Sequence, residues 1–306
     1  MDMMQKGGLL VLLTAIISGF SIFINSFAVK GFDSSVFTFA KNVLVALLLF
    51  AVIIGFSLRK ELLRLSRKQW LQLVGIGFIG GSIPFLLYFK GLQLSVGTTA
   101  GFLHKTMFLS IALFAIILLK ERLTKGLFFG AVLLLAGNFL LIRPDFALST
   151  GLILIIIATV FWALENVWAK HILKNMSGTI IGFGRMFFGS IFILMFLIFT
   201  GKAGLILSMN SSQYLWIVLT TGFLFLYVLT YYNGLKTIRV TTAACILSLG
   251  QVVTVLLDLG FRNLSLTLYD GLALLLIVLG VCSAAFYNTV QGLVQKLLTK
   301  SGLSAG

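Results

Sequence analysis

The sequence predicts an all-α integral membrane protein of ten transmembrane helices, arranged as two inverted five-helix repeats. Three observations support this prediction. Hydrophobic residues make up 59% of the 306 residues and charged residues only 10%, which is far from the composition of a soluble protein. Apolar runs of about 18 residues or more recur along the chain, each long enough to cross a hydrocarbon core. A repeated pattern also relates the two halves of the chain.

Apolar runs separated by short polar interruptions define the spans. The ten predicted spans are 7–29, 36–57, 71–89, 99–119, 126–142, 151–169, 179–200, 214–232, 242–260 and 271–290. We interpret the first as a retained helix, because no convincing small-residue cleavage site follows it. No soluble domain fits between the spans, so the lipid bilayer is the solvent of the whole chain.

The net charge of +15 is explained by topology, because Lys and Arg accumulate in short cytoplasmic loops. With the N-terminus inside, the cytoplasmic side collects Lys6, Arg59, Lys60, Arg64, Arg67, Lys68, Lys120, Arg122, Lys125, Lys170, Lys174, Lys236, Arg239, Lys296 and Lys300. The opposite side collects Lys30, Arg143, Lys202 and Arg262. We therefore expect both termini on the cytoplasmic side of a cell membrane, most simply a prokaryotic plasma membrane, and no nucleic-acid partner.

The two halves are related by a shift of 143 residues. This shift aligns 86–100 with 229–243, where seven of 15 pairs are identical, against about one or two expected by chance. The same register pairs Thr124 with Thr267 and Gly137 with Gly280. The predicted organisation is a first repeat at 1–143, a second at 144–290 and a cytoplasmic tail at 291–306. An odd number of spans inverts the second half, an arrangement that recurs in secondary transporters.

Several motifs occur in matching order in the two halves. They are Trp162–Lys170, with Asn25 and Lys30 placed similarly in the first half, Lys41 and Arg185 in each second span, Tyr88–Gly91 with Tyr231–Gly234, and Lys120–Thr124 followed by Gly130 and Gly137. The chain thereby resembles the EamA-type branch of the drug/metabolite transporter superfamily over nearly its whole length. The resemblance implies export or facilitated movement of amino acids or related metabolites.

Two positions depart from the family pattern. The second half has Leu264 where the first has Glu121, and Phe108 replaces the usual proline of the fourth helix. The resemblance leaves the substrate, the direction of transport, proton coupling and the oligomeric state open.

Ionisable residues inside the spans are candidate site residues, because a charge at mid-membrane costs about 2.5 to 3.5 kcal/mol. Glu165 could bind a substrate amine or take a proton, and Trp162 shares its helical face. The alternative is that Glu165 pairs with Lys170 or Lys174 at the membrane edge.

His104 and Lys105 lie together in the fourth span. We expect Lys105 to hold an anionic group of the substrate, with snorkelling to the interface as the alternative. For His104, hydrogen bonding inside the bundle is favoured over proton transfer.

Lys41 and Arg185 occupy matching depths in their spans and are candidate charge partners of Glu165. Tyr88 and Tyr231 are repeat mates beside polar residues, so they are candidates for stacking on a substrate. We expect Lys105, His104, Glu165 and Tyr231 to face one central cavity.

Other classes of function find little support. The pattern Gly75–Gly80 lies inside a span, not between a strand and a helix, so it does not indicate dinucleotide binding. The sequence predicts neither a metal site nor a cofactor. We expect a secondary transporter of a small amino-acid-like, zwitterionic or anionic metabolite that works by alternating access and is not an enzyme. The alternatives are a membrane channel and a membrane-embedded enzyme.

Overall fold

The computed structural model describes residues 3–28, 32–56, 58–94, 102–143, 149–262 and 266–300. Within these residues ten helices are long and apolar enough to cross a membrane, which confirms the predicted count. They are Met3–Ala28, Ser34–Gly55, Arg67–Gly91, Phe102–Leu119, Lys125–Ile142, Thr150–Ile172, Gly178–Phe199, Ser211–Leu235, Val240–Phe261 and Leu268–Ala285. Lys30, which was predicted in the first connection, lies outside the described residues.

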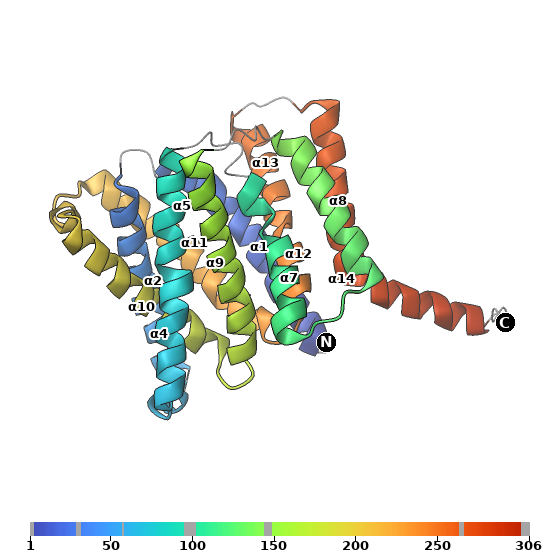
Figure 1. Cartoon of the computed structure of the whole chain (residues 1–306), viewed down its shortest axis with the longest axis horizontal. Helices are drawn as coiled ribbons and strands as arrows, with labels where there is room; N and C mark the ends of the chain where they lie inside the picture. Colours follow the sequence, from blue (N-terminus) through green and yellow to red (C-terminus); the bar gives the residue numbers. More distant parts are fainter. Residues whose placement is uncertain are drawn as a thin grey trace.

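Seven spans are single helices, and Figure 1 shows how the helices are arranged. These are α1 (Met3–Ala28), α2 (Ser34–Gly55), α8 (Lys125–Ile142), α9 (Thr150–Ile172), α10 (Gly178–Phe199), α11 (Ser211–Leu235) and α14 (Leu268–Lys300). The third span is α4 (Arg67–Gly81) followed by α5 (Ile83–Gln93), the fourth contains α7 (Met107–Leu119), and the ninth is α12 (Val240–Leu247) followed by α13 (Leu249–Arg262). Two short elements, α3 (Arg59–Leu63) and η1 (Ala203–Ile206), lie in connections.

Three spans are interrupted, at Ser82, Thr106 and Ser248. In the third span Pro84 follows the interruption, and a proline removes one helical hydrogen bond. The interruptions at Thr106 and Ser248 fall at nearly equivalent positions of the fourth and ninth spans under the repeat register. Thr124 and Thr267 are also equivalent, and each hydroxyl accepts a backbone N–H three residues further on.

Helix packing follows the repeat, because contacts made by a span of one half recur for the equivalent span of the other half. The fifth and tenth spans, α8 and α14, pack side by side at one edge of the bundle (Figure 1). The first span packs on the eighth and ninth, and equivalently the sixth packs on the third and fourth. The second and seventh spans, α2 and α10, contact each other directly. The architecture is therefore ten transmembrane helices as two inverted five-helix repeats.

Close approach of α8 and α14 depends on glycines. A Cβ atom at Gly130 would lie 2.6 Å from the carbonyl oxygen of Gly280, and one at Gly280 would lie 2.9 Å from that of Gly130. Helices in lipid associate mainly by van der Waals packing, which such small residues permit. The repeat mates Gly137 and Gly280 thus both lie in this contact.

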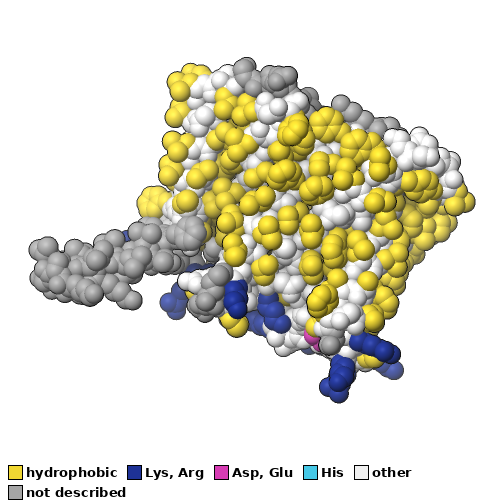
Figure 2. Space-filling view, turned by 180° about the vertical axis from the view of Figure 1, so that it is seen from behind, with side chains coloured by type: hydrophobic (Ala, Val, Ile, Leu, Met, Phe, Trp, Pro, Cys, Tyr) yellow, Lys and Arg dark blue, Asp and Glu magenta, His cyan; other side chains and the backbone are white. Residues whose placement is uncertain are grey.

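Basic side chains gather at one end of the molecule. Figure 2 shows Lys and Arg side chains at the lower end of a face otherwise covered mainly by hydrophobic side chains. We call this the Lys/Arg-rich end, which includes the connections around Arg64, Lys120, Lys170 and Lys236. The opposite end, the far end, includes the connections around Asp33, Arg143, Lys202 and Asp270.

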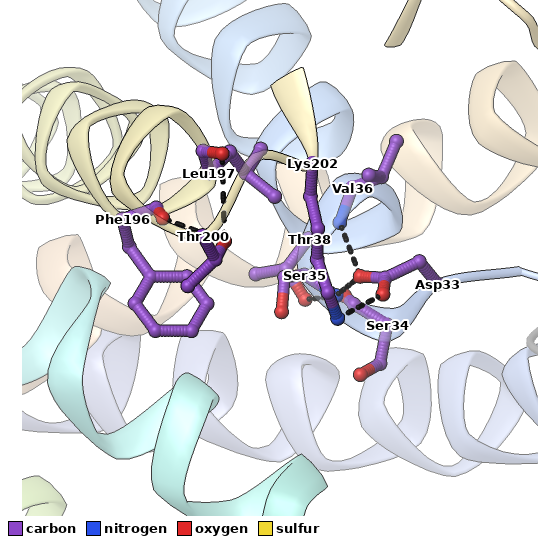
Figure 3. A network of polar contacts seen from close by, with 9 residues as sticks. All are labelled: Asp33, Ser34, Ser35, Val36, Thr38, Phe196, Leu197, Thr200 and Lys202. Carbon is purple, nitrogen blue, oxygen red and sulfur yellow. Dashed lines mark hydrogen bonds and ion pairs between the residues drawn. The ribbon is translucent and has the colours of Figure 1, made fainter. Parts of the chain in front are cut away.

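At the far end Asp33 caps α2 and pairs with Lys202 (Figure 3). Its carboxylate accepts backbone N–H groups of Ser35 and Val36 and lies 2.6 Å from the Lys202 ammonium. Partial burial alone would raise the pKa of Asp33, but the hydrogen bonds from Lys202 and the two amides lower that pKa below its ordinary value. The contact joins the start of α2 to the segment that follows α10.

We expect Asp33→Asn to lower the thermal stability of the detergent-solubilised protein at pH 7. Asn still caps a helix, so the loss reports the charge pair and should be about 0.2 to 1 kcal/mol. Because the folded pKa is depressed, this contribution is present above the unfolded pKa and is lost as the pH falls through the folded pKa. Thermal unfolding at pH 7 and pH 3 measures it, with Lys202→Met as the matched variant. A stability difference that is the same at both pH values would contradict this assignment.

Candidate functional site

The interruption of the third span places a free carbonyl inside the bundle. Pro84 has no N–H, so the carbonyl of Gly80 lacks its helical donor. That carbonyl accepts Arg185 Nε at 3.3 Å, Arg185 Nη2 at 3.2 Å and the indole N–H of Trp162 at 3.2 Å. The neighbouring Gly81 carbonyl accepts the Asn42 side-chain amide at 3.0 Å. Side chains from α2, α9 and α10 therefore converge on one break.

Glu165 lies next to this break and is fully buried. Its Oε1 accepts the hydroxyl of Tyr232 at 2.5 Å, and that hydroxyl accepts Arg185 Nη1 at 3.2 Å. A Cβ atom on Gly80 would collide with the Glu165 side chain, so glycine is what admits the carboxylate here. The other carboxylate oxygen, Oε2, has no hydrogen-bond partner among the described residues.

The pairing of Glu165 with Lys170 or Lys174 is not what the structure shows. Lys170 instead donates to the backbone carbonyls of Leu235 at 2.8 Å and Lys236 at 3.1 Å. The reason is depth: Glu165 lies more than one helical turn before the end of α9, within reach of α10 and α11.

In the first half the equivalent basic residue, Lys41, has a neutral side chain as its partner and not a carboxylate. Lys41 is buried, donates to the side-chain oxygen of Asn25 at 2.8 Å and lies over the ring of Phe37 at 4.6 Å. Of the two predicted charge partners of Glu165, Arg185 reaches it through Tyr232, whereas Lys41 contacts Asn25. The two basic repeat mates therefore serve different partners.

An aromatic cluster adjoins the network at Trp162. The ring centroids of Tyr88, His104 and Phe85 lie 5.4, 5.0 and 5.2 Å from that of Trp162. The rings of Tyr88 and His104 are 5.2 Å apart. His104 Nδ1 has no hydrogen-bond partner in the described part of the chain, so ring packing takes the place of the expected hydrogen bond at that atom.

Tyr231 is buried one helical turn further along the same face of α9. Its hydroxyl donates to the side-chain oxygen of Asn166, whose own amide donates to the Trp162 carbonyl at 2.7 Å. The ring of Tyr231 stacks on that of Tyr227. The repeat mates Tyr88 and Tyr231 both lie against α9, in contact with Trp162 and Asn166 respectively.

Lys105 lines a cavity of about 450 Å³ at the far end. The cavity lies between five spans, and its lining is Ile22, Lys105, Leu141, Ile142, Gln251, Thr254, Val255, Leu259, Leu266 and Asp270. Leu266 is 46% exposed, so the cavity reaches the surface there. Lys105 itself lies beside the interruption at Thr106, and the side-chain oxygen of Gln251 is buried with no partner among the described residues.

Of the four residues expected to share one cavity, Lys105 alone is in the lining of the far-end cavity, so the shared cavity stays a prediction. Lys105 lines the far-end cavity, whereas the other three lie in the packed network on α9. The broken third span brings its carbonyls to α9 and α10, where the buried side chains of Trp162 and Arg185 donate to them. In the described residues no group of three or more His, Cys, Asp or Glu could hold a metal ion.

Sequence reasoning missed the centre of the network and one wall of the cavity. Pro84 in an apolar run was the signal for the freed Gly80 carbonyl. No comparable signal pointed to Gln251 and Thr254, which look like ordinary polar residues of a span.

We expect Arg185→Met and Glu165→Gln to destabilise the protein singly, and less than additively in combination. Removing one partner of a buried charged network leaves the other uncompensated, at a cost of about 3 to 5 kcal/mol. Thermal unfolding of the two single variants and the double variant gives the coupling energy. Strictly additive losses would show that the two charges are energetically independent.

Comparisons with known proteins agree with this architecture. The model of the EamA-like transporter family matches residues 5–143 and 149–286. The chain is 24% identical over 250 residues to the uncharacterized transporter YyaM of Bacillus subtilis (strain 168), covering 78% of this chain and 80% of that protein. A solved structure described as "Crystal structure of protein" has the same fold, with a TM-score of 0.75 and 20% identity over 92% of this chain and 98% of that one. The chain belongs to the EamA-like transporter family and is a multi-pass membrane transporter.

Proposed function

We propose that this transporter carries a small anionic or zwitterionic metabolite, an amino acid or a related compound, as an exporter or facilitator. The observation that carries the proposal is Lys105 in the wall of the far-end cavity. Lys105 has no hydrogen bond or ion pair among the described residues, and the ammonium of a lysine in such a cavity attracts an anionic group.

The rest of the cavity lining suits a solute with both charges. Asp270 supplies a carboxylate, although it also accepts the Thr267 hydroxyl and lies 3.7 Å from Arg143. Gln251 and Thr254 supply neutral hydrogen-bonding groups, and leucine and isoleucine side chains supply apolar surface. This mixture of few polar groups on an apolar wall is typical of a small-molecule site.

The mechanism we propose is alternating access. Lys105 and Gln251 lie close to the interruptions of the fourth and ninth spans, which are related by the repeat. Interrupted helices at the interface of inverted repeats form the substrate sites of many secondary transporters. We propose 1–143 and 144–290 as the two repeats, with the interrupted fourth and ninth spans as their moving parts.

We further propose that the Lys/Arg-rich end faces the cytoplasm, in a cell membrane. With the terminal segments counted, the basic residues assigned to this end outnumber those assigned to the far end by 15 to 4. Both termini, including the tail at 291–306, would then be cytoplasmic, and the far-end cavity would face outward.

Lys105→Ala should lower substrate uptake into proteoliposomes by about 10-fold or more, because a hydrogen bond to a charged group contributes about 1.5 to 3 kcal/mol. Lys105→Arg should retain part of the uptake, since it keeps the charge and changes the shape. The assay uses a panel of radiolabelled amino acids and carboxylates, with and without a pH gradient. Lys90→Ala is the matched control, because Lys90 is exposed at the end of α5. Normal uptake by Lys105→Ala would remove Lys105 from the site.

The orientation can be tested with a membrane-impermeant maleimide on intact cells. In a background of Cys245→Ala and Cys282→Ala, Arg64→Cys should be labelled only after the cells are opened, and Ser208→Cys should be labelled in intact cells. Both positions are exposed, Arg64 at the Lys/Arg-rich end and Ser208 at the far end. The reverse pattern would mean that the basic residues face outward.

A further inference from the structure

Glu121 holds the start of the ninth span. It lies in the connection between the fourth and fifth spans, and its Oε1 accepts the backbone N–H of Val240 at 3.1 Å. Its Oε2 accepts the hydroxyl of Thr241 at 2.7 Å. Both donors belong to the first turn of α12, where the unpaired N–H groups of a helix favour an anion. At the Lys/Arg-rich end one carboxylate therefore ties the fourth and fifth spans to the ninth.

The equivalent position in the second half carries no acceptor. Thr124 and Thr267 are structural equivalents, because each hydroxyl caps the next span. Glu121 lies three residues before Thr124, and Leu264 lies three residues before Thr267. Leu264 itself is outside the described residues. Whatever its position, a leucine side chain cannot accept a hydrogen bond as Glu121 does.

Inversion of the repeats places these two positions at opposite ends of the molecule. Glu121 lies at the Lys/Arg-rich end, where α7 and α12 pack against each other. The connection between the ninth and tenth spans lies at the far end, where Leu266 and Asp270 line the cavity. The Glu121 contact thus lies at the end of the molecule opposite to the far-end cavity.

We propose that Glu121 is a gating residue, whose hydrogen bonds to α12 hold the Lys/Arg-rich end closed and make the state open at the far end the lower in energy. The proposal rests on the alternating-access mechanism proposed above, but not on Lys105 or on the substrate. In the opposite state the Glu121 contacts break, and the far end closes without a matching contact because position 264 is leucine.

Cys245 provides a reporter that the chain already contains. It is buried in α12, one helical turn beyond Thr241. In a Cys282→Ala background, we expect Glu121→Leu to raise the rate at which Cys245 reacts with a maleimide added at the Lys/Arg-rich end by about 10-fold. This factor corresponds to about 1.4 kcal/mol in the opening equilibrium, the lower range for a hydrogen bond to a charged group. Glu121→Gln keeps one hydrogen-bond acceptor, so the labelling rate of Cys245 in this variant should lie between the rates in the parent protein and in Glu121→Leu.

Glu61→Leu is the matched control. Glu61 accepts the backbone N–H of Ser177 at 2.7 Å, also beside the start of a helix at the same end, but no hydrogen bond among the described residues joins it to the ninth span. Cys245 labelling should therefore be unchanged in Glu61→Leu. Equal acceleration by both variants, or an unchanged rate in Glu121→Leu, would overturn the gating role. Thermal unfolding of each variant separates local opening from general destabilisation.

The converse change tests the asymmetry. Leu264→Glu should slow labelling of a Val255→Cys variant from the far end, in a background of Cys245→Ala and Cys282→Ala, because Val255 lines the cavity. Unchanged labelling would show that position 264 does not set the preference between states. None of these labelling rates requires a substrate. The gating role of Glu121 can therefore be disproved while the Lys105 variants still lose transport, and the role of Lys105 can be disproved while the labelling rates change as expected.

Discussion

The carbonyl oxygen of Gly80 has no helical donor, because Pro84, four residues later, has no N–H. In lipid no water can take the place of that donor. The surrounding helices supply the replacement: the guanidinium of Arg185 and the indole of Trp162 both donate to this one atom. Arg185 can stay buried because that carbonyl, the Tyr232 hydroxyl and the nearby Glu165 carboxylate surround it. One missing N–H thus accounts for the convergence of Arg185 and the Trp162 indole on this carbonyl.

The two halves differ in charge around their buried basic residues, Lys41 and Arg185. Asn25 precedes Lys30 by five residues, as Glu165 precedes Lys170, so the neutral amide and the acid occupy similar places. Lys41 consequently has an amide as its hydrogen-bond partner, whereas Arg185 has a carboxylate within its network. Lys105 in the cavity wall is a third base within the spans, beside Lys41 and Arg185. An interior with an excess of positive charge favours an anionic group over a cation, which supports the proposed substrate class.

Span number, inverted architecture and family could all be predicted from the sequence, because each depends on patterns repeated over many residues. The candidate site could be predicted only in part. Glu165, Arg185 and Lys105 stand out because a charge in an apolar run is costly. Tyr232, which links Glu165 to Arg185, does not stand out. Neither does Gln251, which lines the cavity with Lys105, since the roles of both depend on which helices meet. Whether these residues share one cavity does not follow from the sequence, because depth along a span does not say which face of the helix points inward.

The polar network and the cavity differ in what they allow to move. Hydrogen bonds through Gly80, Gly81 and Arg185 fasten the second, third, sixth, seventh and eighth spans together inside the bundle. Breaking them would expose buried polar groups to lipid, which disfavours relative motion of these spans. The fourth and ninth spans instead carry their own interruptions, at Thr106 and Ser248, and border the cavity. Interrupted helices need fewer contacts to be broken when one part tilts, so we expect alternating access to occur by movement of these two spans against a fixed network. Glu121 lies where the two moving spans meet at the Lys/Arg-rich end, which is why a single carboxylate there can bias the whole exchange.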